Sequence, residues 1–220
     1  MRWLPVARPL AFSLLAAVGS GCADAAGRFQ AFEERRAVTG LGGAGGGSET
    51  GGGGADCAPP APGMVHGRAL LALETATSPG IAILFLGELT TPEIASQTAV
   101  KFEYRALDQA DRTTEVGDEL VVGPYPIGAD GSFDAPTEAS TLPGSANAIL
   151  PGAPITSQLT LHGTICGVAD FYCGTVTGTV TSPIKAETNG HFGITILVDE
   201  HVPERPRYGC EPDALAPALP

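Results

Sequence analysis

Two carboxylates around a tight turn are the best candidates for metal chemistry in this sequence. The segment 130–134 (DGSFD) resembles part of an oxygen-rich calcium loop, but Glu138 is the sole sign of the further acidic ligands that an EF-type loop needs. The alternative is that Asp-Gly makes a turn and that Phe133 packs into the core. We expect the turn, and we keep Asp130 and Asp134 as candidate calcium ligands.

Aromatic side chains are scarce, so the candidate contact residues are few. Carbohydrate-binding faces usually present exposed aromatic rings. The plausible rings here are Tyr104, Tyr125, Phe171, Tyr172 and Tyr208. Phe171 and Tyr172 lie between two cysteines, and a disulfide that closed this loop would constrain both rings and lower the entropy cost of a contact. We predict that Phe171 and Tyr172 contact a glycan or a protein partner.

Catalytic motifs are missing from the sequence. It contains no G-x-S-x-G, H-E-x-x-H or Walker segment. His66 and His162 each stand alone in an expected strand. His191 and His201 flank another strand and lie roughly 30 Å apart if it is extended, too far to share one ion. We therefore predict a non-enzymatic protein with no cofactor other than calcium at the turn described above.

The first 21 residues have the anatomy of an export signal. Arg2 and Arg8 precede the apolar stretch 10–18 (LAFSLLAAV), and small residues follow up to Cys22. The sequence VGSGC that ends at Cys22 resembles the lipobox of bacterial lipoproteins. It departs from the usual pattern, because Gly19 stands where leucine is typical.

The lipobox resemblance covers only this N-terminal segment, and it implies a location in the cell envelope and a lipid anchor. In that family the cysteine becomes the lipidated first residue of the mature protein, so Cys22 is expected to carry palmitate-type acyl chains. Ala23 follows it where an inner-membrane retention signal would have Asp, which implies sorting to the outer membrane, on either face. The alternative is an ordinary secretory signal that is cleaved within 23–27.

The four remaining cysteines suit disulfide bonds in an oxidising compartment, because their number is even. We predict the pair Cys166–Cys173, which would close a hairpin loop, and the pair Cys57–Cys210, which would join the two ends of the domain. The alternative is a zinc site, but C-x6-C spacing lacks the tight C-x2-4-C element of structural zinc sites.

The chain is acidic overall, with 12 basic and 24 acidic residues and a formal charge of −12. Nucleic-acid affinity comes largely from Lys and Arg contacts with phosphates, so nucleic acid is excluded as a partner. The acidic residues between Glu115 and Glu138 are interpreted as favouring solubility. No window beyond the N-terminus has the 18 apolar residues of a candidate membrane helix.

Composition divides the chain into four parts. Residues 1–21 are the signal, and residues 22–56 are a tether whose Gly-rich tract predicts a flexible coil. Residues 57–211 form the folded domain, and residues 212–220 are predicted to be a disordered tail.

The folded domain contains short strands separated by turns. Alternating or continuous apolar patterns predict strands at 68–75, 81–86, 98–107, 119–122, 132–133, 155–165, 174–181, 184–187 and 191–198. Asn189-Gly190 predicts a hairpin turn before the last strand. The predicted fold is all-β, an antiparallel β-sandwich of immunoglobulin or jelly-roll type, with a small β-barrel as the alternative.

Two functional interpretations follow. The first is a non-enzymatic envelope lipoprotein that presents a disulfide-linked β domain on a flexible tether, with a structural role or a role in contact with an envelope protein. The second is a surface module that binds carbohydrate or calcium, which rests on analogy between folds.

Overall fold

The computed structural model describes residues 57–198 and 201–218. The expectations for the signal, Cys22 and the tether lie outside these residues. Ten strands are present: β1 (His66–Thr75), β2 (Ala82–Thr90), β3 (Glu93–Ile94), β4 (Gln97–Leu107), β5 (Glu115–Pro126), β6 (Ser132–Pro136), β7 (Ser140–Leu142), β8 (Ile155–Thr164), β9 (Phe171–Ser182) and β10 (Ala186–Ile196). The all-β prediction is confirmed. No helix that could cross a membrane occurs in the described ranges.

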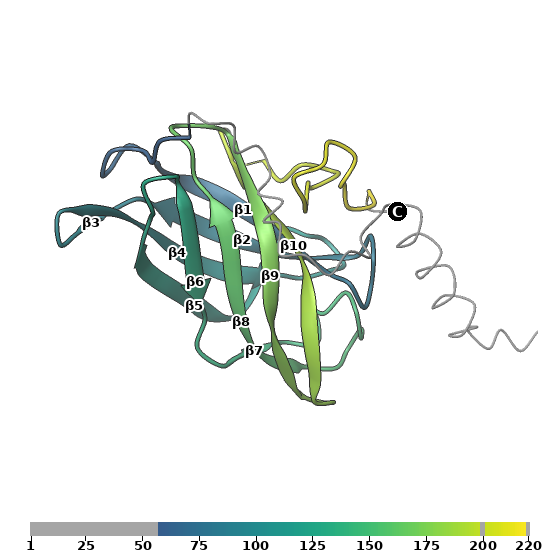
Figure 1. The fold of residues 1–220 in the computed structure, drawn as a ribbon. Helices are drawn as coiled ribbons and strands as arrows, with labels where there is room; N and C mark the ends of the chain where they lie inside the picture. The colour runs from purple at the N-terminus through teal and green to yellow at the C-terminus, as the bar shows by residue number, and fades with distance from the viewer. Residues whose placement is uncertain (1–56, 199–200, 219–220) are drawn as a thin grey trace, which may run out of the picture. The chain divides into compact units, whose positions relative to one another are not determined.

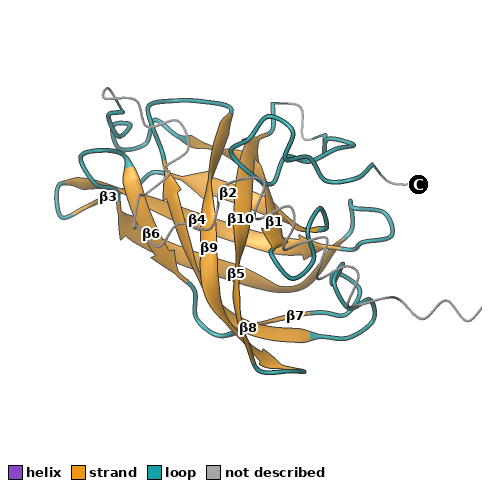
Figure 2. Ribbon diagram, turned by 45° about the vertical axis from the view of Figure 1, so that its right-hand side comes forward, coloured by secondary structure: helices purple, strands orange, loops and turns teal. Residues whose placement is uncertain are grey.

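All the strand pairs are antiparallel, and they form one curled sheet (Figure 1, Figure 2). The strand order is β3-β4-β2-β1-β10-β9-β8-β6, with β5 also paired to β4 and β7 also paired to β8. The two ends of the curl approach each other where the Tyr125 hydroxyl donates to the carbonyl of Pro136 at 2.8 Å. This half-barrel is consistent with both the sandwich and the small barrel that the sequence predicts.

Strand β1 lies at the centre of the domain and is buried on both faces from Ala69 to Thr75. Alternate side chains, such as Leu71 and Leu73, face the main core inside the curl with Phe102, Phe133 and Phe192. The intervening side chains belong to a second, outer apolar cluster. That cluster comprises Leu70, Ala72, Ala82, Leu84, Leu86, Leu107 and Ala216. The curled sheet therefore needs a cover on its convex side.

The C-terminal segment supplies that cover, and the prediction of a disordered tail from residue 212 is wrong for residues 212–218. Ala216 is only 1% exposed, and its N–H donates to the carbonyl of Pro206. Arg207 and Leu215 form an isolated β-bridge. The segment, yellow in Figure 1, lies next to β10. Burial against the apolar outer face offsets the entropy cost of ordering a Pro- and Ala-rich tail.

All four cysteines of the domain form disulfides, as expected, but the predicted pairing is wrong. The bonds are Cys57–Cys166 and Cys173–Cys210. Tyr172 is buried inside the curl, so its neighbour Cys173 projects from the opposite face, where the C-terminal segment packs. Each end of the domain is thus joined separately to the region of the β8–β9 connection.

The predicted hairpin at Asn189-Gly190 is also wrong, because β10 continues through both residues. Strand β10 pairs with β9 on one side and with β1 on the other. Gly190 opposes Thr75, and a Cβ atom there would lie 1.9 Å from the Glu74 carbonyl oxygen. The glycine therefore permits close approach of two strands, and the chain reverses instead between Ser182 and Ala186.

Candidate ligand cavity

The curl encloses a cavity of about 920 Å³. Its lining comes from β1, β2, β4, β5 and β8, from residues 137–143, and from the end of β9, the following turn and the start of β10. A volume of this size lies within the range of small-molecule sites in proteins, which is roughly 300–1,000 Å³. Apolar side chains dominate the lining.

The cavity is apolar at its base, and apolar side chains continue up to its mouth. Leu71, Phe102 and Leu161 at the base are each less than 5% exposed. Val121, Leu150 and Ile184 also line it and are 50%, 43% and 71% exposed. Large apolar side chains with that much exposure are unfavourable in water unless something covers them. These three residues extend the apolar path from the core to solvent.

One polar group in the cavity wall lacks a partner. Tyr104 lines the cavity and is 1% exposed, and its hydroxyl has no hydrogen bond within the described part of the chain. A buried hydroxyl without a partner costs about 1–3 kcal/mol. Burial raises the pKa of Tyr104 well above its ordinary value, so the group remains a neutral hydrogen-bond donor. The hydroxyl oxygen is shielded from solvent, so Tyr104 lines the cavity with its ring rather than with this group.

A bulge in β5 shapes one side of the mouth. Between the pairs Tyr104–Leu120 and Ala106–Val116, three residues of β5 stand opposite one residue of β4. The bulge begins at Gly117, which has φ of +78° and packs so closely on Pro143 that an added Cβ would lie 3.0 Å from its ring. Bulges re-aim side chains at strand edges, and this one carries Asp118 and Glu119 into the cavity lining.

Acidic groups are the only ionisable side chains, apart from Tyr104, that line the cavity within the described residues. They are Asp118, Glu119, Glu138 and Glu187. All four are exposed, which places them at the mouth rather than at the base. No Lys, Arg or His residue lines the cavity in the part of the chain that the structure describes.

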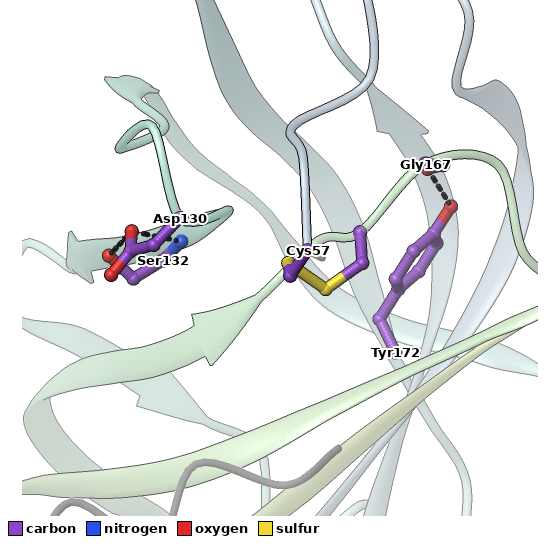
Figure 3. The surroundings of a disulfide bond; sticks show 6 residues. Cys57, Asp130, Ser132, Gly167 and Tyr172 are labelled. Atoms are coloured by element: carbon purple, nitrogen blue, oxygen red, sulfur yellow. Dashed lines mark hydrogen bonds between the residues drawn. A yellow bond between two sulfur atoms is a disulfide. The ribbon is translucent and has the colours of Figure 1, made fainter. Parts of the chain in front are cut away.

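The predicted contact pair Phe171 and Tyr172 does not form an exposed loop tip. Both residues belong to β9, and Tyr172 is 4% exposed. Its hydroxyl accepts from the Ala169 N–H and donates to the Gly167 carbonyl, close to the Cys57 disulfide (Figure 3). Phe171 stacks under the guanidinium of Arg207, whose carbon lies 4.0 Å from the ring centre. Both rings therefore have structural partners.

The candidate calcium ligands Asp130 and Asp134 bind different protein groups. Asp130 accepts from the backbone N–H and the hydroxyl of Ser132 (Figure 3), and the hydroxyl bond lowers the pKa of its carboxyl group. Asp134 Oδ1 lies 2.6 Å from His162 Nδ1. No group of three or more His, Cys, Asp or Glu that could hold a metal occurs within the described ranges. The turn interpretation of 130–134 agrees with this geometry, and Phe133 is buried in the core, as that interpretation expects.

His162 links Asp134 to a hydroxyl group. Its Nε2 lies 2.9 Å from Thr177 Oγ1, so a carboxylate, an imidazole and a hydroxyl follow one another across β6, β8 and β9. A nucleophilic site would need an oxyanion hole beside this hydroxyl. The backbone of Thr177 is instead engaged in two ladders, with β8 and with β10. None of the three residues lines the cavity. The arrangement fits a cross-strand polar contact on the sheet surface.

The cavity combines residues that sequence patterns treat separately. The sequence alone places Tyr104 among the plausible contact aromatics, and it indicates a solubilising role for Asp118, Glu119 and Glu138. The glycines within β5 are the one local signal of an irregular strand edge. Comparison with protein-family models found no match, and comparisons with curated proteins and with solved structures found no significant similarity.

Proposed function

We propose that this protein is a non-enzymatic binding module, anchored in the bacterial envelope through Cys22, that holds one small apolar molecule in the cavity of its β domain. The observation that carries the proposal is the cavity of about 920 Å³, whose lining is mainly apolar. A concave, mainly apolar cavity of this size is the usual form of a small-molecule site.

The location in the envelope is supported by two independent features. The N-terminal sequence has the order of an export signal and ends in a lipobox-like VGSGC. The domain also contains two disulfides, which persist in oxidising compartments such as the periplasm and the cell surface. The Gly-rich tract before Cys57 would then separate the domain from the membrane surface.

The geometry favours an apolar ligand over a sugar or calcium. Sugar sites usually present exposed aromatic rings, whereas Tyr104 and Tyr172 are buried and the other candidate rings, Tyr125, Phe171 and Tyr208, are only partly exposed. A calcium site needs converging oxygen ligands, whereas Asp130 and Asp134 are directed to Ser132 and His162. A purely structural or protein-contact role is the second candidate, because two disulfides in a domain of this size favour persistence over conformational change.

The test is binding of a neutral fluorescent probe. The chain from residue 22 onward, carrying Cys22→Ser so that no lipid is attached, would be exported on a separate cleavable signal and purified without detergent. N-phenyl-1-naphthylamine should bind at one site with a blue-shifted emission, and it should raise the melting temperature, because a ligand that binds only the native state stabilises it by mass action. Absence of both effects would favour the structural role.

Paired variants locate the site. Ala106 is buried in the cavity wall, and Arg105 precedes it on the same strand with an exposed side chain. Ala106→Phe should fill part of the cavity and weaken probe binding at least about tenfold, which is the effect of losing about 1.4 kcal/mol. Arg105→Phe adds the same ring outside the cavity and should leave binding unchanged. If Ala106→Phe does not fold, Ser157→Phe and its exposed neighbour Gln158→Phe form a second pair.

A further inference from the structure

We infer that the ligand is an amphiphile with a cationic head group, such as an amine or a quaternary ammonium, rather than a fatty acid. The inference rests on the proposed function, because it assumes that the cavity binds an apolar chain. It adds the charge of the head group that the acidic mouth would select. The apolar tail would lie in the cavity and the head group would lie at the mouth among the carboxylates.

The mouth carries one sign of charge. Asp118 and Glu119 come from the bulge of β5, Glu138 from the segment after β6, and Glu187 from β10. Four exposed carboxylates from three separate parts of the chain therefore line one apolar cavity. Lys185 is the nearest base in the sequence to Glu187, and it is exposed and does not line the cavity.

Within the described part of the chain the mouth carboxylates form no ion pair, and the exposed Arg105, which stands opposite the β5 bulge, does not line the cavity. The ion pairs found there use other acidic residues: Glu88, Glu103, Glu115 and Asp134. Glu187 has only the Thr179 hydroxyl within hydrogen-bond range, at 3.5 Å. An anionic head group placed here would meet four like charges and no counter-charge, whereas a cation would be attracted by all four.

The exposed apolar residues at the mouth support an amphiphile. Val121 follows Glu119 closely on β5, and Ile184 lies in the turn before Glu187. Exposed apolar side chains and acidic side chains thus lie close to each other in the sequence at the cavity mouth. An aliphatic chain that leaves the cavity past these residues would bring its head group among the carboxylates. Low-dielectric walls beside the charges also strengthen their field at this point.

The experiment compares three probes that share a ten-carbon chain and differ in charge: decyltrimethylammonium, decan-1-ol and decanoate. Each competes with N-phenyl-1-naphthylamine on the chain from residue 22 with Cys22→Ser. In water each carboxylate at about 8 Å changes affinity by a factor of about two, so four should make the cation bind at least about 15-fold more tightly than decan-1-ol. Decanoate should bind more weakly than the alcohol. Both differences should shrink in 0.5 M NaCl, where the screening length is a few ångströms.

A matched pair of variants assigns the effect to the mouth. The variant D118N/E119Q/E138Q/E187Q removes the four mouth carboxylates, and it should bind the three probes with similar affinity. The control variant E93Q/D170N/E204Q/E211Q changes the net charge equally at exposed residues that do not line the cavity. It should keep the cation preference.

The outcomes separate this inference from the proposed function. If none of the probes displaces N-phenyl-1-naphthylamine, or if the dye itself does not bind, the proposed function fails. If decan-1-ol binds but charge makes no difference, or if decanoate binds best, the charge inference fails and the cavity remains a binding site. A preference that survives in the mouth variant, or that is lost in the control variant, also overturns the charge inference.

Discussion

A buried carboxyl group on β1 shows how a single residue connects burial to pH. Glu74 is 6% exposed, and its Oε1 accepts from the Gly80 N–H at 3.1 Å. Desolvation raises the pKa of Glu74 above the ordinary value of a glutamate, while the hydrogen bond from Gly80 and the nearby His191 partly offset this rise. The folded protein therefore binds this proton more tightly than the unfolded chain does.

The pH dependence of stability follows from that sign. The contribution of Glu74 is fully present below about pH 4.5, and it is lost as the pH rises through the higher pKa of the folded state. Glu74→Gln keeps an acceptor for the Gly80 N–H and avoids the buried charge. It should raise the melting temperature by a few degrees at pH 7 and leave it unchanged at pH 4. The exposed residue Glu93 provides the control, E93Q, which should show no such pattern. Equal melting temperatures of E74Q and wild type at pH 7 would contradict the prediction.

At the scale of elements, the C-terminal segment depends on its disulfide and on the outer apolar cluster. The bond Cys173–Cys210 closes a loop of 37 residues, worth about 4 kcal/mol in the chain-entropy model. The double variant Cys173→Ala/Cys210→Ala should lower stability by up to that amount and free the segment to detach. Detachment would uncover Leu70 and Leu84 on the convex side of the sheet.

Limited proteolysis and thermal melting together check this prediction. The double variant should be cleaved between residues 202 and 218 while the strands survive, and its melting temperature should fall. The variant Cys57→Ala/Cys166→Ala removes the other bond and should leave the C-terminal segment resistant. Cleavage at equal rates in both variants would show that the segment does not depend on its own disulfide.

The strands show which elements the sequence could predict and which it could not. The apolar alternation of 98–107 and 155–165 predicts β4 and β8 to within one residue, because period-two patterning is a local property. The prediction of a turn at Asn189-Gly190 is wrong, because β10 pairs with a strand on each side and these tertiary contacts override a local turn preference. The predicted disulfide pairing is wrong for a similar reason. The face of the sheet on which Cys173 lies depends on the burial of its neighbour Tyr172, which is a property of the folded domain.

The cavity was not predictable, because its walls are far apart in the sequence. It forms where β4 and β5 curl over β8, and the curl depends on bulges at Gly117 and Gly123 and on a long-range strand order. Tyr104 has the pattern of an inward-facing strand residue, but nothing local shows that its hydroxyl lacks a partner. The acidic residues at the mouth likewise have meaning only once the curl brings them together.

For the whole molecule, the proposed lipid anchor on Cys22 would determine at which membrane surface the cavity binds its ligand. Wild-type protein should fractionate with membranes, and its mature N-terminus should be Cys22 with the added mass of acyl chains. Cys22→Ser should lack this mass. The variant Ser20→Ala keeps a small residue before the cysteine and should behave as wild type. A mature N-terminus within 23–27, without added mass, would instead establish an ordinary secreted protein.

The two disulfides also decide how the domain responds to a pulling force. A load applied between Cys57 and Cys210 passes through Cys57–Cys166 and Cys173–Cys210, so only the chain between Cys166 and Cys173 can extend. Those seven peptide units span roughly 25 Å, whereas the reduced chain between the same ends would extend to roughly 500 Å. The walls of the cavity lie within the bypassed stretches. A domain tethered at the cell surface could thus be dragged by its ends while its cavity keeps its shape.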